Sequence, residues 1–345
     1  MVQEAYTSTA AGGVRQGRGL TWRIRMLIVQ KFGGSSLADA ERLRRAAGIC
    51  MAARNRGHSV VMVVSAMGDT TDGLIELAHT ISSAPPAREL DALMSTGEQR
   101  SAALMAITLE SMGVSALSLT GWQAGMYTDG THGDAALELT MPTRISAALR
   151  AGVTPVVAGF QGVDIRGDVT TLGRGGSDTS AVALSAALPA QRCEIYTDVN
   201  GIYTADPRLV GGARRLSEID YGDMLLLARG GSQVLHARSV ELAEAGGVDI
   251  YLLSSAGEPG YSVVRRLENE RRPDFAGVTR DTARSCVTLV GKGCRSHTLP
   301  ELAALLTDAG VSVRGGRMGA GYASVKTDPG QLSFALEKVH EYIFE

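Results

Sequence analysis

Short apolar runs alternate with segments of helical spacing along most of the chain. The runs that predict buried strands are 27–29, 60–64, 114–119 and 153–158. The segments with helical spacing are 42–47, 74–82, 101–110, 136–151 and an alanine-rich stretch that ends at Leu188. Near-continuous apolar strands separated by amphipathic helices are typical of a mostly parallel sheet covered by helices on both faces. We therefore expect an α/β fold with ligand loops at the carboxyl ends of the strands.

A change of pattern near the C-terminus predicts a second, smaller module. Residues 268–273 are charged and turn-prone, which is typical of a linker. The elements expected beyond it are a strand at 286–290, a helix at 302–309, strands at 311–313 and 323–326, and a helix at 332–342. The predicted domains are thus 26–270 and 271–345. Residues 1–25 are polar and glycine-rich without an apolar core, so we expect a flexible extension and no signal peptide.

The composition narrows the class of protein. Lys plus Arg (34) nearly balances Asp plus Glu (36), which argues against nucleic-acid or membrane-surface binding by bulk charge. No apolar run approaches the roughly 18 residues of a membrane span. The four cysteines show no CxxC pair or metal-ligand spacing, so we expect reduced, mostly buried thiols, a cytoplasmic location and no zinc site. Glycine is abundant (42) and proline scarce (10), which indicates tight loops in a folded enzyme.

Two glycine-rich loops are candidates for phosphate binding. The first, KFGGSS at 31–36, follows a predicted strand and precedes a helix, so glycine N–H groups and a helix start can face an anion. A plain turn with a surface lysine is an equal alternative for this loop taken alone. The second, TLGRGGSDTS at 171–180, places three glycines, an arginine and a carboxylate before a helix. That density favours function over structure.

Three further segments carry weaker signals. Residues 197–208 (TDVNGIYTADPR) combine a turn with an aromatic ring and an arginine, which fits a nucleotide or a turn with a local ion pair. Residues 95–100 (STGEQR) are expected as a loop entering a helix, and 65–71 (SAMGDTT) as hydroxyls that bind substrate or cap a helix. The glycines of 315–321 lie between two predicted strands and indicate a hairpin, while 291–293 indicates a turn.

Together these segments resemble the aspartate kinases of the amino-acid kinase superfamily. The resembling motifs, in family order over 26–270, are KFGGSS (31–36), VVSAMGDTTD (63–72), STGEQ (95–99), TGWQAG (120–125), TLGRGGSD (171–178), TDVNGIYTADPR (197–208) and VLH (234–236). The resemblance implies a three-layer αβα amino-acid kinase fold. It also implies transfer of the ATP γ-phosphoryl group to the side-chain carboxylate of L-aspartate, giving 4-phospho-L-aspartate. Mg²⁺ would be held mainly by the nucleotide phosphates, with no metal ligand from the chain.

The resemblance also implies roles for individual residues. Lys31 would stabilise charge on the transferred phosphoryl group, and Asp178 would hold that lysine. Substrate would be bound by Arg174 at the α-carboxylate and Glu98 at the ammonium, with Ser65 and Thr71 nearby. The residues implied for nucleotide binding are Gly33, Gly34, Ser35, Gly175, Gly176, Ser177, Thr197, Asp198, Tyr203, Arg208 and Gln233.

Departures from the family pattern keep alternatives open. Gln233 stands where the family usually has a nucleotide-binding lysine, so weaker ATP binding or a changed position of the bound ATP is expected. Ala237 replaces a usual proline. The family usually carries two ACT modules, whereas 275–278 resembles the start of the first and 287–345 the second. We therefore expect one truncated ACT-like module, reduced or absent lysine and threonine feedback, and a homodimer through that module. The alternatives are another small amino or dicarboxylic acid as acceptor, or a non-catalytic regulatory subunit.

Overall fold

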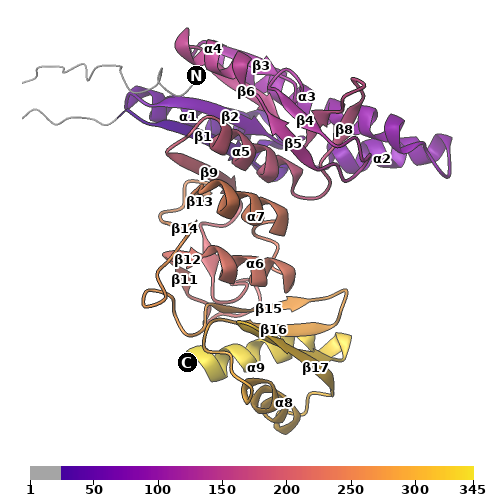
Figure 1. Cartoon of the computed structure of the whole chain (residues 1–345), viewed down its shortest axis with the longest axis vertical. Coiled ribbons are helices and arrows are strands. Elements are labelled where there is room, and N and C mark those ends of the chain that lie inside the picture. The colour runs from indigo at the N-terminus through magenta and orange to yellow at the C-terminus, as the bar shows by residue number, and fades with distance from the viewer. Residues whose placement is uncertain (1–24) are drawn as a thin grey trace, which may run out of the picture.

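The computed structural model describes residues 25–345, so the predicted extension over 1–25 lies, apart from Arg25, outside the described residues. The molecule is elongated, with a large α/β part and a smaller C-terminal part (Figure 1). We call residues 277–344 the C-terminal module. The predicted boundary between 270 and 271 stays a prediction.

An eight-stranded sheet forms the centre of the large part, in the order β12-β14-β13-β9-β1-β2-β6-β3. Its strands are β1 (Leu27–Phe32), β2 (Ser59–Val64), β3 (Ala116–Leu119), β6 (Thr154–Ala158), β9 (Arg192–Thr197), β12 (Glu218–Asp220), β13 (Ile250–Ser254) and β14 (Tyr261–Arg265). All neighbouring strands are parallel except β13 and β14. The mostly parallel sheet expected from the apolar runs is therefore confirmed.

Helices cover both faces of this sheet, and β2 shows why. Val60, Met62 and Val64 pack with the apolar faces of α1 and α3, whereas Val61 and Val63 pack on the other face with α5. A strand buried on both faces loses its polar alternation, which explains the continuous apolar run. The helices of the large part are α1 (Ala40–Asn55), α2 (Thr70–Ile81), α3 (Ala87–Ser111), α4 (Thr143–Arg150), α5 (Gly176–Ala187), α6 (Tyr221–Arg229), α7 (Ala237–Gly246) and the 3₁₀ turn η1 (Gly34–Leu37). The three-layer αβα class is thus confirmed.

Smaller sheets complete the large part. One has the order β5-β4-β7-β8 and the other pairs β10 with β11. Their strands are β4 (Met126–Thr128), β5 (Leu137–Thr140), β7 (Gln161–Val163), β8 (Val169–Thr171), β10 (Ile202–Tyr203) and β11 (Arg215–Leu216). The helix predicted over 136–151 was wrong over residues 136–142, because residues 137–140 form a strand that pairs with β4 and α4 begins only after Pro142.

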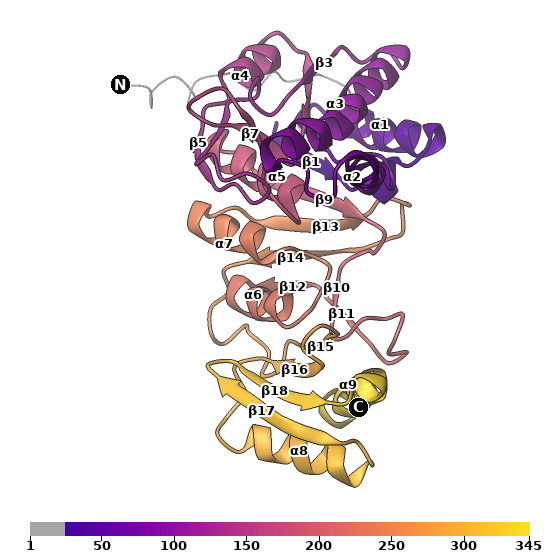
Figure 2. The ribbon, with the colours of Figure 1, turned by 90° about the vertical axis from the view of Figure 1, so that its right-hand side faces the viewer.

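The C-terminal module is an antiparallel sheet, in the order β15-β16-β18-β17, with helices on one face. Its elements are β15 (Gly277–Asp281), β16 (Cys286–Val290), α8 (Thr298–Asp308), β17 (Val313–Gly319), β18 (Tyr322–Thr327), the 3₁₀ turn η2 (Pro329–Gln331) and α9 (Leu332–Phe344). In Figure 2 it lies beyond the β12 edge of the large sheet. The hairpin predicted around 315–321 is confirmed as β17 and β18. The strand expected at 311–313 instead begins at Val313 and continues to Gly319.

A second correction concerns residues 95–100, predicted as a loop. They lie inside α3, which runs without a break for 25 residues. Ser95, Thr96 and Gly97 are poor helix formers, so their local propensity alone favours a loop. The Ser95 and Thr96 hydroxyls donate to carbonyls three residues earlier, so the helix itself satisfies them. Glu98 therefore projects from a rigid helix.

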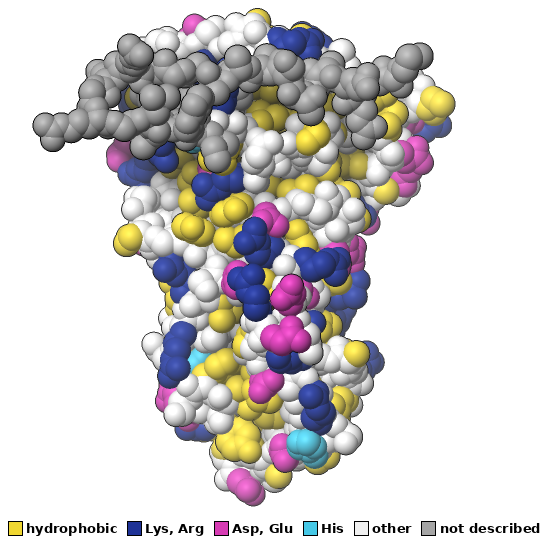
Figure 3. Space-filling model, turned by 60° about the vertical axis from the view of Figure 1, so that its left-hand side comes forward, with side chains coloured by type: hydrophobic (Ala, Val, Ile, Leu, Met, Phe, Trp, Pro, Cys, Tyr) yellow, Lys and Arg dark blue, Asp and Glu magenta, His cyan; other side chains and the backbone are white. Residues whose placement is uncertain are grey.

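The distribution of charges on the surface and the state of the cysteines agree with what the composition predicts. Basic and acidic side chains are interspersed on the face shown in Figure 3. The four cysteines are free, and Cys50, Cys193 and Cys294 are buried. Within residues 25–345, no helix is both long and apolar enough to cross a membrane.

The turn that follows α6 in the large part packs closely against the C-terminal module. Gly230 and Gly231 follow α6 and pack against β15 of the C-terminal module. Gly231 has φ +111°, and a Cβ there would lie 2.2 Å from the carbonyl oxygen of Arg280. Only glycine allows both this backbone conformation and this close approach.

Replacing Gly231 should therefore weaken this junction. We expect Gly231→Ala to lower the free energy of unfolding by more than about 2 kcal/mol, because backbone strain and a backbone clash add. The control is Gly247→Ala, where φ is +62° and the added Cβ meets no atom within 4 Å. That variant should lose only about 1 kcal/mol. Urea unfolding of both variants measures the difference, and equal losses would contradict the close contact at Gly231.

Candidate active site

A buried ion pair lies at the carboxyl end of the central strand β1. Lys31 Nζ is 2.7 Å from Asp178 Oδ1, and the two side chains are only 11% and 12% exposed. Lys31 is the penultimate residue of β1, and Asp178 lies in the first turn of α5. A carboxylate is favoured there by the helix dipole. The two residues predicted as catalytic are thus brought together from positions 147 residues apart.

The glycine loops bring backbone close to this pair. A Cβ at Gly34 would lie 2.6 Å from the Ala66 carbonyl oxygen, and one at Gly175 (φ +71°) would lie 2.3 Å from the Cβ of His236. The N–H groups of Gly33 and Gly176 already donate to Tyr196 and Gly173 carbonyls. Those of Gly34, Gly175 and Ser177 have no hydrogen-bond partner within residues 25–345. Three of the predicted phosphate-facing donors therefore remain available to a ligand.

Glu98 is a buried carboxylate with half of its hydrogen bonds missing. It is 3% exposed, and its Oε1 accepts from the Ala66 N–H at 3.0 Å. Its Oε2 is buried and has no partner in the described part of the chain. Burial raises the pKa of Glu98 from its ordinary value of 4.5 to about 7, and the Ala66 hydrogen bond offsets part of that rise. An unpartnered buried oxygen marks a place where a donor can bind.

Of the other residues predicted to bind substrate, Ser65 and Thr71 lie near Glu98, whereas Arg174 forms no bond to it. Ser65 follows β2, next to Ala66, and Thr71 lies in the first turn of α2. The neighbouring Thr70 methyl would lie 3.5 Å from a Cβ at Gly97, so this helix start borders the Glu98 region. Arg174 is exposed in the loop before α5 and forms no ion pair with any residue of the described chain. Among the described residues, the Arg174 side chain forms no hydrogen bond or ion pair with Glu98, Ser65 or Thr71.

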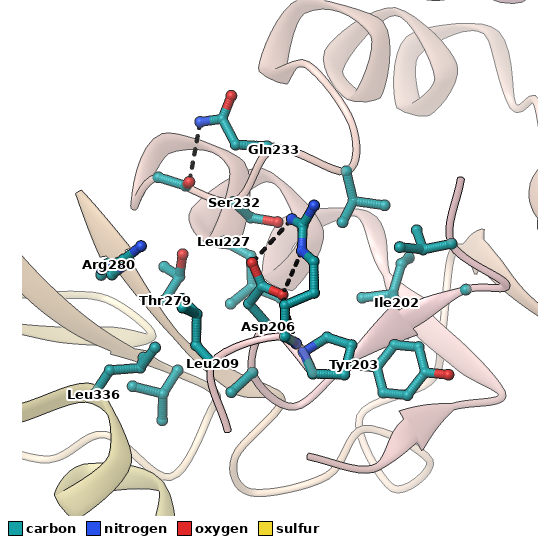
Figure 4. A pocket seen from close by; sticks show the side chains of 18 of the residues that line it. Ile202, Tyr203, Asp206, Leu209, Leu227, Ser232, Gln233, Thr279, Arg280 and Leu336 are labelled. Carbon is teal, nitrogen blue, oxygen red and sulfur yellow. Dashed lines mark hydrogen bonds and ion pairs between the residues drawn. The ribbon is translucent and has the colours of Figure 1, made fainter. Parts of the chain in front are cut away.

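Five of the predicted nucleotide residues line one cavity of about 670 Å³ (Figure 4). These are Thr197, Asp198, Tyr203, Arg208 and Gln233. Arg208 forms two 3.0 Å hydrogen bonds to Asp206, and these hold the pKa of Asp206 below its usual range. The Gln233 amide donates to the Gly231 carbonyl at 3.2 Å. The Tyr196 carbonyl, one residue before Thr197, contacts Gly33 and so connects this cavity to the Lys31 loop.

Ser35 and Ser177 occupy the starts of two helices beside the glycines. Ser35 is exposed in η1, and its carbonyl accepts from Arg42 at 2.6 Å. Ser177 is buried in α5, and a Cβ at Gly159 would lie 2.9 Å from its Oγ. Both serines therefore lie at the loops predicted to face phosphates.

Sequence reasoning missed residues that complete or support the site. The cavity is also lined by Thr279, Arg280 and Leu336 of the C-terminal module, 70 or more residues away from the motif at 197–208. Asp91 is fully buried and accepts from Thr171, at 2.5 Å, and from the Gly133 N–H. Thr171 ends β8 just before the second glycine loop, so Asp91 holds the start of that loop. The sequence does not indicate this role, because an acidic residue in an amphipathic helix is ordinarily expected to face solvent.

The donor set of the site suits a nucleotide better than a bare metal. Among residues 25–345, no group of three or more His, Cys, Asp or Glu side chains is arranged to hold a metal ion. The local charges are instead a lysine, an arginine and helix-start N–H groups, which suit phosphate oxygens.

Comparisons with known sequences agree with this arrangement. The sequence profile of the amino acid kinase family matches residues 26–254. The aspartokinase of Mycobacterium tuberculosis H37Rv is 50% identical over 270 residues, which cover 77% of this chain and 64% of that protein. The aspartokinase of Geobacillus stearothermophilus is 46% identical over 288 residues, covering 83% of this chain and 71% of that protein. The chain thus spans about two thirds of the length of these curated relatives.

Solved structures give the same fold. Aspartokinase III of E. coli, in complex with aspartate and ADP, superposes with a TM-score of 0.81 at 22% identity, covering 92% of this chain and all of that one. Aspartate kinase from Synechocystis superposes with a TM-score of 0.63 at 32% identity, covering 92% of this chain and 69% of that one. With the Lys31–Asp178 pair and the glycine loops in place, the chain belongs to the amino acid kinase family and, within it, to the aspartokinases.

Proposed function

We propose that this protein transfers the γ-phosphoryl group of ATP to the side-chain carboxylate of L-aspartate. The observation that carries the proposal is the buried Lys31–Asp178 pair beside the two glycine loops. A carboxylate oxygen attacks the γ-phosphorus, and ADP leaves with the electrons of the broken P–O bond. The product is an acyl phosphate.

The chemistry requires positioning and charge stabilisation more than proton transfer. The acceptor carboxylate is ionised at neutral pH and needs no general base. Lys31 neutralises charge on the oxygens of the transferred group, and Asp178 fixes the lysine in place. The free N–H groups of Gly34, Gly175 and Ser177 hold phosphate oxygens. Mg²⁺, bound mainly through those phosphates, supplies further charge neutralisation when present.

Glu98 and Arg174 select an α-amino acid as acceptor. The free Oε2 of Glu98 accepts hydrogen bonds from the substrate ammonium. Arg174, exposed and without an ion-pair partner in the described chain, binds the α-carboxylate with its planar guanidinium. Ser65 and Thr71 border the same region. The similarity to aspartokinases makes aspartate the first acceptor to test, ahead of other small amino or dicarboxylic acids.

The cavity between the large part and the C-terminal module holds the nucleotide. Its volume of about 670 Å³ suits a nucleotide-sized ligand, and Tyr203 and Arg208 offer an aromatic surface and a cation. The side chain of Gln233, which lines this cavity, is uncharged, so we expect weaker ATP binding than a lysine at this position would give. The reduced lysine and threonine feedback expected from the sequence stays a prediction.

The catalytic proposal is tested by trapping the acyl phosphate with hydroxylamine, using aspartate and MgATP as substrates. Lys31→Ala should lower kcat by about 10²- to 10³-fold, because it removes one preorganised charge from the transition state. Arg174→Ala should instead raise KM for aspartate more than KM for ATP. Steady-state kinetics of hydroxamate formation measure both effects.

Two controls keep this experiment interpretable. Lys31→Ala leaves Asp178 buried without its partner, so the double variant Lys31→Met/Asp178→Asn removes both charges and preserves the fold. Lys338→Ala removes a lysine of α9 that lines neither the nucleotide cavity nor the Lys31 loop, so this variant should retain full activity. A wild-type protein that forms no hydroxamate above the double variant would refute the proposed function.

The acceptor proposal predicts a pH profile set by Glu98. Only the ionised carboxylate binds an ammonium, so KM for aspartate should rise about tenfold for each pH unit below 7. Glu98→Gln should bind aspartate weakly at every pH, with a flat profile. Succinate lacks the ammonium, so its inhibition constant should not follow the wild-type profile, and a shared profile would contradict the role of Glu98.

The same carboxylate affects stability with a definite sign. Because the folded pKa of about 7 exceeds the ordinary 4.5, the folded state binds the extra proton, and stability falls as pH rises between these values. Glu98→Gln should therefore unfold with about 3 kcal/mol more free energy than wild type above pH 7. The difference should vanish near pH 4.5. Urea unfolding at the two pH values provides the measurement.

We also propose that the protein forms a homodimer through its ACT-like C-terminal module. Among the strands of residues 25–345, β17 pairs with β18 alone, and most of its residues are exposed. An unpaired strand edge of this kind readily pairs with a second copy. Sedimentation equilibrium should give a dimer at micromolar concentration, and a monomer throughout that range would contradict the pairing.

A further inference from the structure

A second cavity, of about 630 Å³, lies between the C-terminal end of α6 and the outer face of the C-terminal sheet. Helix α6 lies against β15 and β16 on the side of the sheet opposite α8 and α9, as Figure 1 also shows. Leu226 of α6 and Tyr322 of β18 line its apolar end. None of the residues predicted from the sequence to bind substrate or nucleotide lines this cavity.

The charge of the cavity wall is strongly one-sided. Its basic residues are Arg229, Arg284, Arg314, Arg317 and Lys326, against the single carboxylate of Asp281. Three of the arginines are engaged in ion pairs, with Glu241, Asp281 and Asp328 respectively. Arg317 and Lys326 form no ion pair with any residue in the described range 25–345. For a protein with net charge −2, this is a local excess of positive charge with two uncommitted cations.

The strand register places these cations beside hydroxyl groups on one face. Arg317 on β17 pairs with Ser324 on β18, which pairs with Thr288 on β16, and all three line the cavity. Thr288 donates to Ser324 at 2.9 Å. Lys326 lies two residues beyond Ser324, and side chains two apart on a strand share a face.

The alternate residues of the same strands serve the core. Val287, Leu289 and Val325 point to the opposite face, where they pack under α8 and α9. The outer face could have been covered by apolar residues in the same alternation, but it carries cations and hydroxyls. That is the donor chemistry of an anion-binding surface.

We propose that this cavity binds a small molecule carrying at least two negative charges on carboxylate or phosphate groups. Arg317 and Lys326 pair with the charges, while Ser324 and the remaining arginines contribute hydrogen-bond donors. The concave shape, the volume of about 630 Å³ and the apolar end formed by Leu226 and Tyr322 favour a small ligand over a nucleic acid. This site does not depend on the proposed kinase activity.

The new site is distinct from the nucleotide cavity but shares a wall with it. Gly231, Thr279 and Arg280 line the nucleotide cavity, whereas Gly230 and Asp281 line the anion cavity. A binding experiment must therefore separate the two sites. Lys31→Ala does so for pyrophosphate, because Lys31 lies at the phosphate loops and outside the anion cavity. Arg174→Ala does so for succinate, because Arg174 belongs to the proposed acceptor site and lies outside the anion cavity.

Calorimetric titration tests the proposal with inorganic pyrophosphate and with succinate, against acetate as the monoanion at constant ionic strength and without Mg²⁺. Arg317→Ala/Lys326→Ala should weaken binding of the preferred dianion about 100-fold, since each charge-assisted hydrogen bond to the ligand contributes roughly tenfold to affinity. The comparison of pyrophosphate with succinate identifies phosphate or carboxylate as the recognised group. The matched control Arg150→Ala/Lys338→Ala removes the same charges outside the cavity and should bind as wild type does.

Cys286 provides a local reporter, since it lines the cavity and is the most accessible of the four thiols. The dianion should slow its modification by N-ethylmaleimide, a neutral reagent, and Cys286→Ala should abolish that signal. Pyrophosphate binding that disappears in Lys31→Ala, succinate binding that disappears in Arg174→Ala, or binding that is equal in the cavity variant and its control would overturn the proposal. Protection of Cys286 that grows with protein concentration without any dianion would also overturn it, because a second copy would then cover the cavity.

Discussion

The position of Lys31 is the constraint on which the rest of the active site depends. Removing a lysine and a carboxylate from water costs several kcal/mol each, and a buried pair seldom adds net stability. The Lys31–Asp178 pair is therefore best understood as a device that fixes position. It connects the end of the central strand β1 to the start of the buried helix α5. Glycines lie two and three residues from each member, so both loops must converge on one point, and Gly34 and Gly175 leave no room there for a Cβ.

Two carboxylates on α3, Asp91 and Glu98, are buried to a similar extent but differ in how many hydrogen bonds they receive. Asp91 is 0% exposed and Glu98 is 3% exposed. Asp91 receives donors from Thr171 and Gly133 and pairs with His132 at 2.9 Å, so its burial is compensated within the protein. Glu98 receives one N–H and keeps one oxygen without a partner. The unpaired oxygen of Glu98 lowers the stability of the fold, which is typical of residues kept for binding. Under the proposed function, the substrate ammonium supplies the missing hydrogen bond.

The sequence predicted the central sheet and the position of the two glycine loops between a strand and a helix, because both follow local rules; their binding of phosphate stays a prediction. Strands buried on both faces leave continuous apolar runs such as 60–64, and phosphate-facing loops require glycine next to a helix start. The helix through 95–100 was missed because its small polar residues mimic a loop, although tertiary packing overrides that propensity. The strand at 137–140 was missed because it has only four residues, none of them buried, and its partner β4 has only three, so neither leaves an apolar run. Thr279 and Arg280 could not be predicted as cavity residues, because their place depends on how the C-terminal module docks.

Because the C-terminal module packs against α6, one strand, β15, contributes residues to both cavities. Consecutive residues of β15 face different spaces: Thr279 and Arg280 line the nucleotide cavity, and Asp281 lines the anion cavity. Gly230 and Gly231, which follow α6, pack against this strand: Gly231 meets the backbone of Arg280 and Asp281, and Gly230 meets the Thr279 methyl group, so neither position has room for a side chain. Because packed backbone transmits displacement with little compression, β15 cannot shift relative to α6 without reshaping both cavities. The junction therefore brings the C-terminal module into direct contact with the cavity proposed to bind the nucleotide.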